Sequence, residues 1–141
     1  VLKAVSILEE EGLIQPVLIG REKKIHKLMD SMNMSNLKEL EIISPEDHDN
    51  FEAFVEDYFK SRQRKGVSAS FARDVMKRGN YFASMMVKKG LADGMVTGAT
   101  QNYPECMRPI MKVIGGHKIA KTKVAGVVIL VPAAAQLHHE A

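Results

Sequence analysis

Short apolar runs alternate along the chain with stretches of helical spacing, and this order constrains the fold more than any other feature. "PVLIG" (16–20) and "LEIIS" (40–44) have the length of buried strands and are bounded by Pro, Gly or Ser. "DGMVTGA" (93–99) and "VAGVVILV" (124–131) predict two further strands. The stretches between them predict helices over 1–13, 21–32, from Ser44 to the basic run 60–66, 68–79, 80–90 and 104–115. Alternating strands and helices predict an α/β fold with a mainly parallel sheet.

The third of these helices has a well-marked start. Ser44 is a good capping residue, Pro45 suits the first helical position, and Glu46 and Asp47 place acids in the first turn. Gly66 is expected to end the helix after the basic run.

Length, charge and cysteine content limit the classes of function. A chain of 141 residues suits one modest domain, and no apolar run approaches the roughly 20 residues that span a bilayer, so no membrane partner is expected. Glutamates near the start are unlike a signal peptide, and one cysteine suits a reducing compartment, so a cytoplasmic location is expected. The net charge of +3 is spread along the chain and aromatics are only 6%, which argues against nucleic acid and fits an anionic small molecule.

The stretch "GLADGMVTGATQNYPECMRP" (90–109) carries the best candidate site. The pattern predicts a strand that passes through Gly98 into a helix near Pro104, and free N–H groups at such a helix start favour anions. Gly98 would let a ligand approach the backbone, and Arg108 could grip a phosphate or carboxylate. A plain turn with a surface arginine explains the pattern equally well.

Other candidates are weaker on the residues alone. The basic run that contains Arg62, Arg64 and Lys65 could bind an anion, but stabilisation of a helix C-terminus explains it better. Cys106 has no histidine nearby in sequence, which makes a nucleophile less favoured than a packing role. The histidines match no zinc spacing, so no metal site is predicted.

Several motifs resemble the phosphate acetyltransferase/butyryltransferase family. They are "ILEEEGLIQPVLIGREKKI" (7–25), "SRQRKG" (61–66), "NYFASMMVKKGLADGMVTGA" (80–99) and "MRPIMKVIG" (107–115), which are collinear with the family over about residues 1–131. The resemblance implies a three-layer sheet with helices on both faces, like isocitrate and isopropylmalate dehydrogenases. Residues 1–131 would be the first lobe of that fold, and residues 132–141 a tail of unclear status.

The "NYP-acid-x-x-RP" form of the loop resembles the carboxy-terminal domain of large bacterial NADP-dependent malic enzymes. This implies a regulatory and oligomerisation domain that binds acetyl-CoA as an effector, while NADP and a divalent metal act on a separate catalytic domain. Malate would be oxidatively decarboxylated to pyruvate there, and a homo-oligomer is expected. The alternative is a true phosphate acetyltransferase, for which acetyl-CoA is a substrate, and a third class is a pure oligomerisation scaffold.

Carried over residue by residue, Arg62 and Arg108 fall on the family's two anion-gripping arginines. Gly98, Asn102 and Tyr103 would form the loop beside them. The family's catalytic residues lie in a second lobe, so no catalytic residue is expected among these 141.

Overall fold

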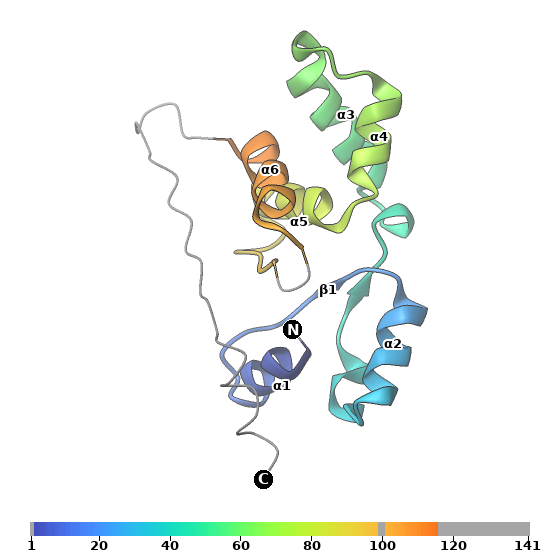
Figure 1. The fold of residues 1–141 in the computed structure, drawn as a ribbon, viewed down its shortest axis with the longest axis vertical. Helices are drawn as coiled ribbons and strands as arrows, with labels where there is room; N and C mark the ends of the chain where they lie inside the picture. Colours follow the sequence, from blue (N-terminus) through green and yellow to red (C-terminus); the bar gives the residue numbers. More distant parts are fainter. Residues whose placement is uncertain (1, 99–100, 116–141) are drawn as a thin grey trace.

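The computed structural model describes residues 2–98 and 101–115, which form two groups of helices joined through a small sheet (Figure 1). The α-helices are α1 (Leu2–Glu10), α2 (Glu22–Ser31), α3 (Phe51–Arg62), α4 (Ala69–Met76), α5 (Gly79–Lys88) and α6 (Tyr103–Val113). The strands are β1 (Leu18–Ile19) and β2 (Ile42–Ile43), and the 3₁₀ turns are η1 (Ser35–Glu39), η2 (Pro45–Asp47) and η3 (Gln63–Lys65). Within these residues no helix combines the length and apolar character that crossing a bilayer requires.

The two strands pair in parallel, and their side chains separate two hydrophobic clusters. Leu18 lies opposite Ile42, and Ile19 lies opposite Ile43. Leu18 and Ile42 pack against one cluster, whereas Ile19 and Ile43 pack against the other. Successive residues of a strand point to opposite faces, so two residues per strand suffice to serve both clusters. The result is an α/β arrangement with a small parallel sheet.

The smaller cluster holds α1, α2 and η1 together. Leu2, Met29 and Leu37 are its buried members, one from each of these elements. Glycine ends α1, because Gly12 adopts a φ of +65°, a left-handed conformation that a helix cannot continue.

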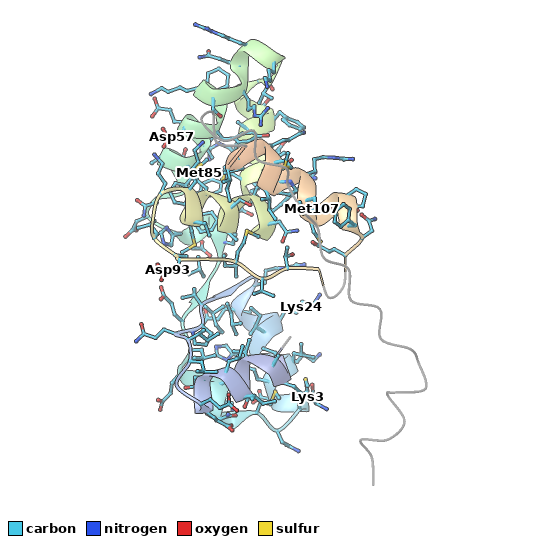
Figure 2. The ribbon with its side chains drawn as sticks, turned by 90° about the vertical axis from the view of Figure 1, so that its left-hand side faces the viewer. Lys3, Lys24, Asp57, Met85, Asp93 and Met107 are labelled. Carbon is cyan, nitrogen blue, oxygen red and sulfur yellow. The ribbon has the colours of Figure 1, made fainter. Side chains whose placement is uncertain are left out.

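The larger cluster joins α3, α4, α5 and α6. α3 packs on α4 and α5 packs on α6, and aromatic rings fill the centre. Phe54 and Phe82 lie 5.2 Å apart between ring centroids, and Tyr58 meets Tyr81 edge-on at 5.7 Å. Met85, labelled in Figure 2, is fully buried among these helices.

Most predicted helices and the first two strands are confirmed within a few residues, but the helix start at Ser44 is wrong. Residues Pro45–Asp47 form only the 3₁₀ turn η2, and the side chain of Ser44 makes no capping bond. The α-helix begins at Phe51, after Asn50. The proline and acidic residues after Ser44 support only the single turn η2. The longer helix α3 starts at Phe51 because Phe51 and Phe54 are buried in the aromatic cluster.

The third predicted strand is not formed over its described part, 93–98. This segment runs beneath α5 and α6, starting near Asp93 (Figure 2), without a strand partner among the described residues. A strand needs a neighbouring backbone to complete its hydrogen bonds. The fourth predicted strand, 124–131, and the tail, 132–141, lie outside the described residues.

Candidate functional site

The start of α6 explains the "NYPE" motif in local terms. The side-chain oxygen of Asn102 accepts a hydrogen bond from the backbone N–H of Glu105 at 3.1 Å. Pro104 follows within the first two helical positions, where the missing N–H of proline costs nothing. Asparagine as cap with glutamate three residues on is a helix-start signature. The motif therefore first determines where α6 begins.

Gly98 lies four positions before the cap residue Asn102, in a backbone conformation that favours glycine. Its φ is +117°, and a Cβ built there would lie 3.8 Å from Sγ of Cys106. A side chain at this position would be strained by the backbone angle rather than by crowding. Tyr103, the first residue of α6, is 52% exposed.

Arg108 lies in the middle of α6 and is exposed. Glu105 and Lys112 are three positions before it and four after it, so the three side chains share one polar face of the helix. The other face of α6 is buried and carries Cys106, Pro109 and Val113. Arg108 is thus presented to solvent by a helix whose other face is fixed in the core.

Arg62, the last residue of α3, contacts the C-terminal end of α6. Its Nε donates to the carbonyl oxygen of Lys112 at 3.0 Å, and its Nη2 donates to the same oxygen at 2.5 Å. Nη2 also approaches the carbonyl oxygen of Met111 at 3.4 Å. The last carbonyls of a helix lack intrahelical partners and carry partial negative charge, so a guanidinium there satisfies both needs.

Tyr58 precedes Arg62 by one helical turn and is fully buried. Its hydroxyl has no hydrogen-bond partner among the described residues. Burial, with a smaller contribution from Tyr81, raises the pKa of Tyr58 to about 12. The hydroxyl therefore stays protonated throughout the physiological range.

The predicted site residues are distributed along one helix instead of converging in one pocket. Gly98, Asn102 and Tyr103 lie at the N-terminus of α6, Arg108 lies in its middle, and Arg62 contacts its last turn. Two hollows among the described residues lie elsewhere. One of about 510 Å³ adjoins Glu9, Leu13 and Glu41, the other of about 250 Å³ adjoins Glu22, Ser44 and His48, and neither is lined by a predicted site residue.

Sequence reasoning did not single out the contacts that hold the turn before α6. Asn80, in the first turn of α5, accepts a hydrogen bond from Oγ1 of Thr97 at 2.8 Å and donates one to Oε1 of Gln101. The thiol of Cys106 also points to Oε1 of Gln101, at 3.8 Å. An asparagine next to a glycine is an ordinary turn signal, and nothing in the local pattern reveals partners 17 and 21 positions away.

Histidine, cysteine and carboxylate side chains form no group of three that could hold a metal ion within the part of the chain that the structure describes.

A model of the family described as "Phosphate acetyl/butaryl transferase" matches residues 1–139. A phosphate acetyltransferase of Thermoanaerobacterium thermosaccharolyticum is 34% identical over 124 residues, which are 86% of this chain and 37% of that protein. The phosphate acetyltransferase of Bacillus subtilis is 32% identical over 130 residues, 92% of this chain and 39% of that protein. A phosphotransacetylase structure from Staphylococcus aureus superimposes with a TM-score of 0.75 at 26% identity, covering 86% of this chain and 36% of that one.

These relatives correct the interpretation of the chain as part of a malic enzyme. The relatives reported above are named phosphate acetyltransferase and the matching family model is that of phosphate acetyl/butaryl transferases, so the expectation of an NADP-dependent oxidoreductase is wrong. The prediction rested on the "NYP-acid-x-x-RP" loop. Asn102 caps α6, so the motif has a role in helix formation that does not depend on a malic enzyme domain.

Proposed function

Because the chain belongs to the phosphate acetyl/butaryl transferase family, we propose that it forms the first lobe of a phosphate acetyltransferase. The reaction moves an acetyl group between acetyl-CoA and inorganic phosphate. The observation that carries the proposal is the set of relatives with this name that match 86% to 92% of the chain. The likeness to a phosphotransacetylase structure supports it.

The chain spans 37% to 39% of the length of these relatives, so the remaining catalytic groups would come from the rest of the protein. In the transfer, a phosphate oxygen attacks the thioester carbonyl carbon, the C–S bond breaks, and the CoA sulfur leaves with a proton. The other lobe would supply the base and the stabilisation of the oxyanion. The finer fold, a three-layer sheet like that of isocitrate and isopropylmalate dehydrogenases, belongs to the same proposal.

Within this lobe, Arg108 would bind an anionic group of acetyl-CoA or of acetyl phosphate. It is exposed, and the core contacts of Cys106 and Val113 hold its helix in place. An arginine held on a rigid element can bind phosphate oxygens through two hydrogen bonds at once. Gly98, Asn102 and Tyr103 would shape the ligand's surroundings at the start of the same helix.

Arg62 would combine two roles. Its Nε and Nη2 are committed to the carbonyl oxygens of Lys112 and Met111, while Nη1 makes no hydrogen bond with the described residues. The guanidinium can therefore hold the end of α6 and still offer one nitrogen to an anion. This predicts that changes at Arg62 affect stability and ligand binding together.

A small-molecule acyl-CoA partner, a homo-oligomer and a cytoplasmic location also belong to the proposal. The oligomer follows from the family resemblance. α6 adds physical support, because Tyr103 and Met111 on this helix and Ile114 directly after it are apolar side chains that are 42% to 52% exposed. Light scattering on the full-length protein would test it, and a monomer at micromolar concentration would contradict it.

The function itself is tested by acetyl phosphate formation from acetyl-CoA and phosphate, with the full-length gene product. Wild-type protein should turn over, and Arg108→Ala should lower kcat/KM by about 10- to 100-fold, chiefly through the KM of an anionic substrate. Arg64→Ala is the matched control, because Arg64 is an exposed arginine in η3 that is not one of the predicted site residues. Absence of turnover in the wild-type protein would overturn the proposal, and equal losses for both variants would remove Arg108 from the site.

A further inference from the structure

The amide of Asn80 joins two points of the chain on either side of Gly98. Its oxygen accepts from Thr97, directly before this glycine, and its nitrogen donates to Gln101, directly before the cap of α6. Both donor and acceptor of a single side chain are used, and both partners belong to the connection that leads into α6.

α5 gives Asn80 a fixed place from which to act. Gly79, at the start of this helix, lies so close to β1 that an added Cβ would meet Cγ2 of Ile19 at 3.4 Å. Tyr81 and Phe82, which follow Asn80, are buried in the aromatic cluster. Asn80 is thus anchored by a sheet contact on one side and by core packing on the other.

A second contact of the same kind lies one turn further along α5. Ser84 is fully buried, and its hydroxyl points to Sδ of Met95 at 3.4 Å while donating to the carbonyl oxygen of Asn80. Met95 and Thr97 therefore face α5, whereas Val96 between them is 98% exposed. This alternation shows that the segment lies along α5 in extended form and reaches Asn80 last, where the turn begins.

We propose that Asn80 is a positioning residue that holds Thr97 and Gln101 in place, and through Gln101 the start of α6. This inference rests on the proposed function only in one respect, namely that Gly98 and α6 contact substrate. Gly98 gives the turn conformational freedom that would have to be lost on binding. By holding Thr97 and Gln101 in advance, Asn80 removes part of that cost and keeps Asn102 and Arg108 in a fixed relation to the rest of the lobe.

The test uses full-length protein with three variants, Asn80→Ala, Gln101→Ala and the double variant. Each single change should lower kcat/KM about 10-fold or more through a raised KM, with kcat changed less. Because Gln101 acts on the start of α6 through the hydrogen bond that it shares with Asn80, the double variant should lose no more than the more damaging single variant. Ser84→Ala is the matched control, since it removes a contact between α5 and the same segment at a position further from the turn.

Hydrogen exchange at the amides of Glu105 and Cys106, which donate to Asn102 at the start of α6, gives a readout that does not depend on catalysis. Asn80→Ala should accelerate exchange there, and Ser84→Ala should not. Unchanged kcat/KM in Asn80→Ala beside a clear loss in Arg108→Ala would overturn the positioning role while leaving the proposed function intact. Losses that multiply in the double variant would also overturn it. If the wild-type protein does not turn over, the proposed function fails, and unchanged exchange in Asn80→Ala then refutes the positioning role separately.

Discussion

Arg62 donates two hydrogen bonds to the backbone carbonyl oxygen of Lys112, fifty positions further along the chain. The end of α3 is thereby fastened to the last turn of α6, the helix that carries Arg108. This contact makes Arg62, one of the two predicted anion-binding arginines, part of the support for the helix that carries the other. It also leads to the first prediction.

Replacement of Arg62 by alanine should lower the free energy of unfolding by about 1.5–3 kcal/mol, because the carbonyl oxygens at the end of α6 lose a charged donor. Arg62→Lys should recover only part of this, since an ammonium cannot reproduce the planar fork. Urea unfolding measures both. Arg64→Ala, two positions on and exposed, should change stability by less than about 0.5 kcal/mol. A loss of equal size in Arg64→Ala would contradict this account of Arg62.

The cap of α6 gives a second prediction. Asn102→Ala should cost about 1 kcal/mol of stability, because the N–H of Glu105 loses its acceptor. Asn102→Asp keeps an acceptor at the same place and should remain near wild type. Thermal unfolding of the pair decides the point, and an aspartate variant as unstable as the alanine variant would show that Asn102 acts in another way.

Gly98 is predicted to be intolerant of a side chain for a conformational reason. At a φ of +117°, Gly98→Ala should cost about 1–3 kcal/mol although space is available, with Sγ of Cys106 as the nearest atom at 3.8 Å. Gly94→Ala is the control, because Gly94 has open space and no positive φ. Equal stability of the two variants by chemical denaturation would argue that the turn relaxes without cost.

Tyr58 offers a prediction in which removing a polar group stabilises the protein. The buried hydroxyl has no partner among the described residues, so Tyr58→Phe should raise the free energy of unfolding by about 1 kcal/mol at pH 7. Tyr103→Phe, at a side chain that is 52% exposed, should have little effect. Destabilisation by Tyr58→Phe would mean that the hydroxyl is bonded in solution.

The same tyrosine should make the protein less stable in alkali. Its pKa is raised from 10.0 to about 12 in the folded state, so above pH 10 the unfolded chain releases this proton while the folded chain keeps it. The free energy of unfolding should therefore fall as the pH rises from about 10 to about 12. Tyr58→Phe should fall less steeply over that interval, as measured by urea unfolding at several pH values. Parallel curves for the two proteins would contradict the shift.

Local patterns predicted much of the fold because the interactions behind them are local. The helices α2, α5 and α6 begin and end near their predicted bounds, since helical hydrogen bonds join residues four apart and glycine or asparagine marks the ends. Strand β1 was visible as an apolar run between Pro16 and Gly20. The segment 93–98 was misjudged because a strand depends on a second backbone, which its own sequence does not specify.

For the candidate site, too, some features follow from the local sequence and others only from tertiary packing. The sequence by itself determined that Asn102 and Arg108 would lie on one helix shortly after Gly98, because the three residues are close in sequence and the helix-start signal at Asn102 is local. Only the tertiary structure decided that Arg62 holds the far end of that helix and that Asn80 holds the turn before it. Those contacts join residues 17 to 50 positions apart, and they form because packing of α3, α5 and α6 around one aromatic core brings their side chains within hydrogen-bonding distance.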